Sequence, residues 1–167
     1  MRKTTALILL SLAASAAYAA PADWSKVRPV DEPDMVWMVV EHPEGLKAMF
    51  AIPESDGGLL WMDCAGKGAL TLTYVDSKLE PHTPYEVHLK SGAHETAVAA
   101  KTDERMDLDD LVFLTTAKIK DKPFLTSLKR GEQLAIIIDH ATKGRFAAEQ
   151  LPPHAAKLKR FFKACKL

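Results

Sequence analysis

The two cysteines of this 167-residue chain constrain its fold more than any other feature. Cys64 ends residues 59–64, a run whose alternation predicts a β-strand with Met62 and Cys64 on the same face. Residues 66–68, Gly-Lys-Gly, are typical of a tight turn because glycine accepts a positive φ. Residues 70–75 alternate as the returning strand, so Cys64 is predicted to lie in a β-hairpin.

The second cysteine lies in a C-terminal stretch, residues 153–167, that predicts a helix. Its apolar side chains recur at helical spacing and form one stripe: Ala155, Leu158, Phe161, Phe162 and Cys165. Its basic side chains largely occupy the rest of the helix surface: Lys157, Lys159, Arg160, Lys163 and Lys166. Both cysteines are therefore predicted on faces that look inward.

We predict a disulfide between Cys64 and Cys165 that docks the tail helix on the sheet. The N-terminal pattern described below is typical of exported chains, in which two cysteines favour pairing. A closed loop of this length is worth about 4–5 kcal/mol in the chain-entropy description of disulfides. The alternative is two separate buried thiols, which behave as small hydrophobic side chains.

The N-terminus has the pattern of a secretory signal peptide. Arg2 and Lys3 precede an apolar run at residues 6–14, and Ala17 and Ala19 supply the small residues before a cleavage site after Ala19. The run is short for a membrane span and nothing later reaches its length, so we expect no transmembrane segment in the mature chain. We expect a periplasmic or secreted protein, with a retained N-terminal anchor as the alternative.

The expected organisation is a signal peptide at 1–19, an extended lead-in at 20–33, and one domain at 34–167. The chain has 22 basic and 22 acidic residues, and the signal peptide accounts for two of the basic ones. No strong global field attracts nucleic acid, so no nucleic-acid partner is expected. The expected partner is a protein or a component of the cell envelope.

Repeated strand-like runs separated by short turns predict a mainly β fold. Eight or nine strands are expected, from the runs 35–40, 47–52, 59–64, 70–75, 85–90, 93–100, 111–116, 133–138 and 145–148. Asp121 and Gly131 bracket a short helix near residues 122–130. This order favours an antiparallel β-sandwich or open barrel, with the C-terminal helix packed on the sheet.

Part of the chain resembles small exported proteins of the invasion-associated locus B type and their uncharacterised relatives. The resemblance rests on Trp61-x-x-Cys64, on Phe124-Leu125-x-x-Leu128-x-x-Gly131-x-x-Leu134, on Phe146, and on Leu158-x-x-Phe161-Phe162-x-x-Cys165. It implies a periplasmic β-sandwich without an assigned active site, and it provides no catalytic residues to carry over.

Histidines are the first candidates for a metal site, and the chain has six: His42, His82, His88, His94, His140 and His154. If Ser91 and Gly92 form a two-residue turn, His88 faces Glu95, and the imidazoles of His88 and His94 point to opposite sides of the sheet. A different turn would reunite them. No H-x-x-x-H, H-E-x-x-H or C-x-x-C gives zinc spacing. His88, His94 and His140 are kept as candidate ligands, but no metal or other cofactor is expected.

Three further sets of residues have a chemical and a structural interpretation. The methionines at 35, 38, 49 and 62 suit copper(I), but each lies in an apolar strand run, which favours core filling. The acidic run at 103–110 lacks the glycine and terminal glutamate of an EF-hand, which favours a solvated loop over calcium binding. Asp63, Asp139, His88 and His140 are candidates for an acid–base set, but only Asp139 and His140 are local, and neighbours on a strand face apart.

The sequence predicts an exported domain of unassigned activity that binds a partner without catalysis. The basic side of the tail helix suits an anionic membrane or partner, although packing on its own sheet explains the apolar stripe better. The alternative function is a small periplasmic hydrolase or metal-binding protein that uses His and Asp or Glu from loops. An enzyme requires a pocket where histidine and carboxylate converge, whereas a binding module requires an exposed apolar patch or sheet edge.

Overall fold

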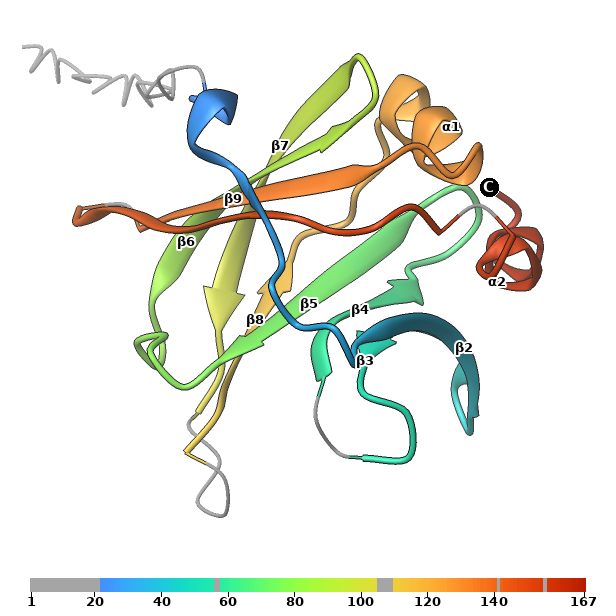
Figure 1. Ribbon diagram of the computed structural model, residues 1–167, viewed down its shortest axis with the longest axis horizontal. Helices are drawn as coiled ribbons and strands as arrows, with labels where there is room; N and C mark the ends of the chain where they lie inside the picture. The colour runs from blue at the N-terminus through green and yellow to red at the C-terminus, as the bar shows by residue number, and fades with distance from the viewer. Residues whose placement is uncertain (1–21, 56–57, 105–109, 141, 155) are drawn as a thin grey trace, which may run out of the picture.

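The computed structural model describes residues 22–55, 58–104, 110–140, 142–154 and 156–167 (Figure 1). The predicted signal peptide and residues 105–109 of the acidic run lie outside the described residues. The strands are β1 (Arg28–Pro29), β2 (Val36–His42), β3 (Gly45–Ala51), β4 (Gly58–Cys64), β5 (Leu70–Asp76), β6 (Pro84–Ser91), β7 (His94–Thr102), β8 (Val112–Thr116), β9 (Leu134–His140) and β10 (Gly144–Gln150). The helices are the 3-10 helix η1 (Trp24–Lys26) and the α-helices α1 (Lys122–Lys129) and α2 (Lys159–Ala164).

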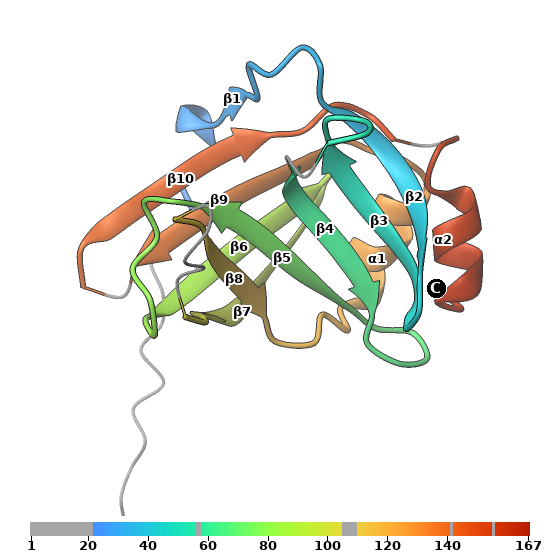
Figure 2. The ribbon, with the colours of Figure 1, turned by 90° about the horizontal axis from the view of Figure 1, so that it is seen from below.

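The strands of the described residues form one ten-stranded sheet in the order β1-β10-β9-β6-β7-β8-β5-β4-β3-β2. Neighbouring strands are antiparallel except β1 and β10, which run parallel. The sheet curls into a half-barrel whose inner side faces the two α-helices (Figure 2). The predicted mainly β class is therefore confirmed, in the form of one curled sheet.

The strand positions follow from the alternation of apolar and polar residues. Every one of the nine runs expected from the sequence is a strand, with ends displaced by at most two residues. The tenth strand, β1, lies in the segment expected to be an extended lead-in. It is only two residues long, it pairs with Glu149 and Gln150 of β10, and Val30 continues the pairing by donating to the Gln150 carbonyl at 3.0 Å.

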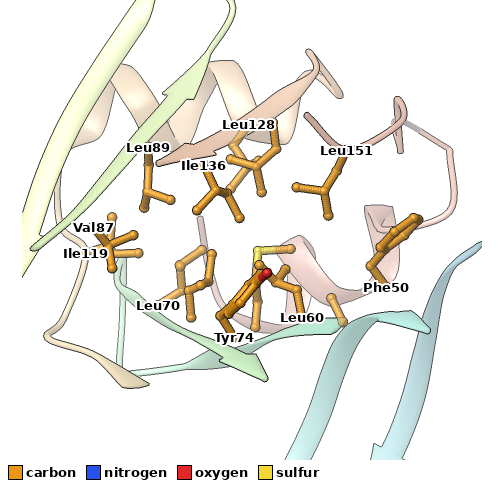
Figure 3. Packing of buried hydrophobic residues seen from close by; sticks show 14 of the residues in the cluster. Phe50, Leu60, Leu70, Tyr74, Val87, Leu89, Ile119, Leu128, Ile136 and Leu151 are labelled. Carbon is orange, nitrogen blue, oxygen red and sulfur yellow. The ribbon is translucent and has the colours of Figure 1, made fainter. Parts of the chain in front are cut away.

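The hydrophobic core fills the inner side of the half-barrel. Figure 3 shows side chains from both halves of the sheet pointing toward one another, among them Leu60, Tyr74, Leu89 and Ile136. Leu60 and Leu89 are completely buried. By the usual relation between buried apolar area and free energy, each such leucine stabilises the fold by about 1.5–3 kcal/mol.

Helix α1 closes the core at one end and has the caps expected from its sequence. The Asp121 side chain accepts a hydrogen bond from the Phe124 amide at 2.8 Å, which satisfies one free donor of the first turn. Gly131, with φ +81°, lies just beyond the helix in the left-handed region that glycine tolerates best. Phe124 and Leu128 are buried against the sheet, so the predicted helix near 122–130 is confirmed.

The C-terminal helix is shorter than predicted. The sequence suggested residues 153–167, whereas α2 spans Lys159–Ala164. The difference arises because the Trp37 indole donates to the Pro152 carbonyl at 2.8 Å and holds this part of the chain against β2. The chain then turns before α2 begins, with the amides of Lys157 and Leu158 both donating to the His154 carbonyl.

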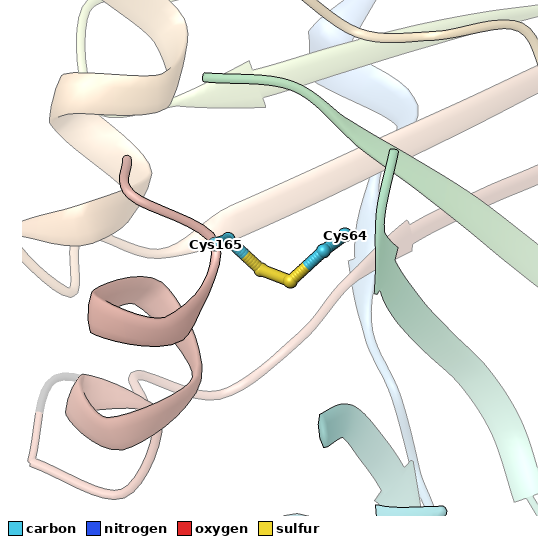
Figure 4. Close-up of a disulfide and its surroundings, with 2 residues drawn as sticks. All are labelled: Cys64 and Cys165. Carbon is cyan, nitrogen blue, oxygen red and sulfur yellow. A yellow bond between two sulfur atoms is a disulfide. The ribbon is translucent and has the colours of Figure 1, made fainter. Parts of the chain in front are cut away.

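The predicted disulfide between Cys64 and Cys165 is present. Figure 4 shows Cys64 at the end of β4 joined to Cys165, which follows α2 directly. The two Cα atoms are 5.2 Å apart, within the ordinary range for a disulfide. Phe161 and Phe162 are buried on the same side, so the covalent bond and the apolar stripe dock α2 together.

The turn of the β6–β7 hairpin differs from the expected one by one residue. Ser91 pairs with His94, which makes Gly92 and Ala93 the turn instead of Ser91 and Gly92. Gly92 has φ +56° and supplies the left-handed conformation that the turn requires. His88 consequently faces Ala97 and not Glu95. The shift is two residues along the partner strand, so His88 and His94 still project to opposite faces, as expected.

One polar contact crosses the inside of the half-barrel. The Tyr74 hydroxyl on β5 donates to Glu149 Oε1 on β10 at 3.1 Å, and Glu149 Oε2 is buried without a hydrogen-bond partner among the described residues. Burial raises the pKa of the Glu149 carboxyl; the bond from Tyr74 opposes this effect, and the charge of Asp76 adds to it. Burial, together with the negative charges of Glu149 and Asp76, also raises the pKa of Tyr74.

Loss of the disulfide should strongly destabilise the fold. We expect the Cys64→Ala/Cys165→Ala variant to lose about 4–5 kcal/mol of unfolding free energy, because the unfolded chain regains the entropy of a long open loop. Urea unfolding of the wild type and of the variant, each with and without reductant, measures this. Reductant should destabilise only the wild type; an unchanged wild-type midpoint in reductant would contradict the role given to the bond.

Replacement of Glu149 by Gln should change how stability depends on pH. The raised pKa means that the folded state keeps a proton which the unfolded chain releases above its own value near 4.5, so wild-type stability falls as pH rises through this window. Glu149→Gln lacks this loss, and its stability relative to wild type should increase with pH. Denaturant unfolding at several pH values tests this, with the exposed Glu54→Gln as control. A pH-independent difference between Glu149→Gln and wild type would refute the assignment.

Candidate functional site

A cluster of charged side chains surrounds His88 on the outer face of the sheet. His88 points outward because Val87 and Leu89 point into the core. Its Nε2 lies 3.7 Å from Glu86 Oε2 and 3.6 Å from Asp139 Oδ2. Asp139 belongs to β9, which lies beside β6, so the sheet brings together two of the four residues considered for acid–base chemistry.

Contacts around this cluster fasten the N-terminal segment to the sheet. Arg145 Nε lies 3.1 Å from Asp139 Oδ1, and Arg145 Nη1 donates to the main-chain oxygen of Asp23 at 3.2 Å. Lys90 pairs with Glu95 at 3.1 Å and lies 5.4 Å from the centroid of the Trp24 ring. Because Arg145 already neutralises Asp139, the arrangement suits a structural ion-pair network.

His140 lies in a second polar group on the other side of its strand. Its Nδ1 accepts hydrogen bonds from the amides of Thr142 at 3.0 Å and Lys143 at 3.2 Å, so Nε2 carries the proton. That Nε2 lies 3.6 Å from Glu80 Oε2, and Lys143 forms an ion pair with the same carboxylate. The hydrogen bond from Lys143 lowers the pKa of Glu80. Asp139 and His140 thus have separate partners, as expected for strand neighbours.

The remaining candidate residues are dispersed. His42, His82 and His94 are exposed, and Asp63 pairs with Lys47 at 3.3 Å. Within the described residues, no group of three or more His, Cys, Asp or Glu side chains is arranged to hold a metal ion.

Met62 fills the core as expected, because it is completely buried. The expectation that the methionines fill the core is wrong for Met38 and Met49, which face each other across β2 and β3 and are only half-buried. The reason is that these two strands project Trp37 and Phe50 into the core, which directs the adjacent methionines to the outer face.

At one end of the molecule α1, α2 and the end of the chain come together (Figure 1). Two cavities of about 510 Å³ and 410 Å³ share Lys129 and Leu167 in their linings, so they lie next to each other. We call the two together the basic groove. Its rim consists of six basic residues: Lys122, Lys129, Arg130, Lys159, Lys163 and Lys166. Its apolar lining consists of Leu125, Phe162 and Leu167.

Three separate segments are held together to make this groove. α1 presents its basic side chains outward because Phe124 and Leu128 are turned into the core. The Gly68 amide, in the β4–β5 turn, donates to the Cys165 carbonyl at 3.4 Å. Lys129 Nζ donates to the main-chain oxygen of Leu167 at 2.5 Å, which ties α1 to the last residues.

The groove is rich in positive charge. Among the described residues that line its two cavities, none carries a carboxylate side chain. Five of the six rim side chains form no ion pair or hydrogen bond within the described part of the chain, whereas Lys129 donates to the main-chain oxygen of Leu167. Neighbouring cations raise the local concentration of anions. The sequence predicted the basic side of α2, but it did not predict that these residues lie beside the basic residues of α1.

His154 is buried behind the groove and connects the two helices. Its Nε2 lies 2.9 Å from the Leu128 carbonyl of α1, and because a carbonyl only accepts, this nitrogen carries the proton. Its ring packs against Trp37, with centroids 5.1 Å apart, and against Phe162 of α2, at 5.9 Å. Nδ1 is buried without a hydrogen-bond partner among the described residues. Burial lowers the pKa of His154, although the bond to Leu128 opposes the effect.

Neither the basic groove nor two further cavities, one beside Lys90 and Gln133 and one beside Pro29 and Phe50, is lined by His88 or His140. No helix of the described residues is both long and apolar enough to cross a membrane. Comparisons with protein-family models, with curated proteins and with solved structures found no match. The basic groove is therefore the candidate functional site on the geometry alone.

Acidification should destabilise the fold through His154. Because the pKa of His154 is lowered in the folded state, the unfolded chain takes up a proton near pH 6.5 that the folded state does not bind. Stability is therefore lost as the pH falls below this value. We expect His154→Gln, which keeps a donor for the Leu128 carbonyl, to show a shallower loss between about pH 7.5 and pH 5. Denaturant unfolding of both proteins measures the two slopes, and equal slopes would exclude His154 as the source.

Proposed function

We propose that this protein is an exported, non-catalytic binding domain that acts in the periplasm and holds an acidic envelope ligand in the basic groove. Export is supported by the N-terminal pattern of Arg2, Lys3 and the apolar run that follows them. It is also supported by the disulfide between Cys64 and Cys165, because such bonds persist in oxidising compartments.

The observation that carries the proposal is the combination of concavity, charge and apolar lining in one place. Ligand sites are typically concave, largely apolar, and provided with a few polar groups that fix the ligand. The larger cavity of the groove has the volume of an ordinary small-molecule site. The six cations select for negative charge, and the partly exposed Leu167 provides an apolar part.

The alternative function, a hydrolase or metal-binding protein, is best supported by the His88–Asp139 and His140–Glu80 pairs. Neither pair lines the basic groove or the two further cavities named with it, and Arg145 and Lys143 already engage the two carboxylates. These contacts favour stabilising roles. A periplasmic binding domain also agrees with the resemblance to the invasion-associated locus B type, and that kinship remains a prediction.

Charge reversal in the groove should weaken the binding of acidic probes. The probes are a Glu-rich peptide with one leucine, phosphatidylglycerol vesicles, and 1-myristoyl lysophosphatidic acid. We expect at least one to bind the wild type, with an affinity that falls as salt rises. Lys122→Glu/Lys163→Glu reverses one exposed cation in each cavity, and should weaken that binding by about tenfold or more.

The matched control is Lys78→Glu/Lys101→Glu, which makes the same change in net charge at exposed positions away from the groove. It should bind like the wild type, and thermal unfolding should show that both variants are folded. The proposal fails if no acidic probe binds, or if the two double variants weaken binding equally.

A further inference from the structure

The two edges of the sheet differ in how they are covered. At one edge β1 pairs with the last residues of β10, and Val30 continues this pairing. At the other edge β2 pairs only with β3 (Figure 2). Within the part of the chain that the structure describes, no main-chain hydrogen bond joins the free side of β2 to another segment. α2 reaches this strand through the side chains of Arg160 and Glu41, which leaves the main chain of β2 free. Such an edge presents unpaired donors and acceptors to any strand that approaches it.

β2 lacks the features by which proteins usually protect an exposed edge. Its seven residues include no lysine and no proline, and their register with β3 is unbroken, so no bulge bends the strand away. Residues 36–40 carry no charge. Because Trp37 is buried in the core, the side chains of Val36, Met38 and Val40 lie on the outer face, where they are half-buried. The free edge is therefore long, regular and apolar.

The turn between β2 and β3 determines which main-chain groups point to the free edge. His42 pairs with Gly45 across a two-residue turn, and the pair that closes such a turn is hydrogen-bonded. Hydrogen-bonded and non-hydrogen-bonded pairs alternate along antiparallel strands, so the even-numbered residues of β2 direct their main-chain groups to β3. The main-chain groups of Trp37, Val39 and Glu41 consequently point away from the sheet.

This pattern allows β2 to pair with a second β2 about a two-fold axis at Met38. Trp37 of one copy then exchanges main-chain hydrogen bonds with Val39 of the other, and each copy uses only groups that are free in the single chain. Met38 faces Met38 in a non-hydrogen-bonded pair, where side chains come closest, and Val36 faces Val40. Every side-chain pair in the centre of the contact is apolar, which stabilises a pair of strands.

The polar residues at the ends of β2 select this axis over its neighbours. An axis one residue away, at Trp37 or at Val39, would set Asp34 or His42 against a valine. The axis at Met38 instead brings Asp34, which precedes the strand, toward His42 at the end of the other strand. A carboxylate only accepts and an imidazole can donate, so these two groups match.

We infer that β2 is a self-association edge, through which two copies of this chain pair antiparallel about an axis at Met38 and extend the sheet across both molecules. This inference does not depend on the ligand proposed for the basic groove. One pair of strands makes an interface at the small end of specific interfaces, so the dimer is a reversible one.

Sedimentation equilibrium measures this association. We expect the wild type to be mainly monomeric at about 5 µM and mainly dimeric at about 500 µM. Val39→Pro removes a main-chain donor on the free edge without touching the ladder to β3, and should keep the protein monomeric throughout. Val39→Thr is the matched control, because it keeps the donor and the branched shape, and its dimer should dissociate within about threefold of the wild type. Thermal unfolding checks that both variants are folded.

A single new cysteine tests the position of the axis. Cys64 and Cys165 are joined to each other, so a new thiol has no partner in its own chain. Met38→Cys sets two thiols opposite each other, and we expect oxidised glutathione, which takes up the two electrons, to convert them to a disulfide-linked dimer. Val40→Cys is the matched control on the same face: its two thiols lie about 13 Å apart along the strands and should stay unlinked. Non-reducing electrophoresis separates the two outcomes.

Three results would overturn the inference. A wild type that stays monomeric at about 500 µM would leave the edge to a strand of another protein. A dimer that Val39→Pro leaves intact would use a different surface. Cross-linking that is equal for Met38→Cys and Val40→Cys, or absent from both, would remove the axis at Met38 and with it the self-complementarity of the strand.

Discussion

The covalent bond between Cys64 and Cys165 is the constraint on which the C-terminal part of the structure depends. α2 has only six residues, too few to be stable as an isolated helix, and the Leu158 that precedes it provides no side-chain cap. Its position comes instead from the disulfide and from the burial of Phe161 and Phe162. The groove inherits this dependence, because Lys166 and Leu167 follow the bonded cysteine directly and the Gly68 turn follows its partner.

Much of the fold could be predicted from the sequence because its strands alternate regularly and each turn has its own chemistry. The cap at Asp121 and the pairing of the two cysteines belong to this readable part. β1 was not predictable, since two residues carry no periodicity and its partner β10 lies far along the chain. The late start of α2 could not be predicted for a similar reason. It depends on the contact between Trp37 and Pro152, which forms only in the folded sheet.

The candidate site was harder to predict than the fold, because it is assembled from three segments. The basic residues of α2 were visible as one face of a helix, but Lys122, Lys129 and Arg130 join them only when α1 and α2 meet. Likewise, the approach of His88 to Asp139 requires β9 to lie beside β6, a strand order that local patterns do not encode. The chemical groups can be identified from the sequence, but which of them lie close together depends on the topology of the fold.

The position of the disulfide at the groove links the shape of this surface to the redox state of its surroundings. When the bond is reduced, α2 is held only by the burial of Phe161 and Phe162 and by the contact of Lys129 with Leu167, so the last residues gain freedom. The shape of this end of the molecule is therefore conditional on oxidation, and a chain exported as proposed would complete it only after it has left the reducing compartment.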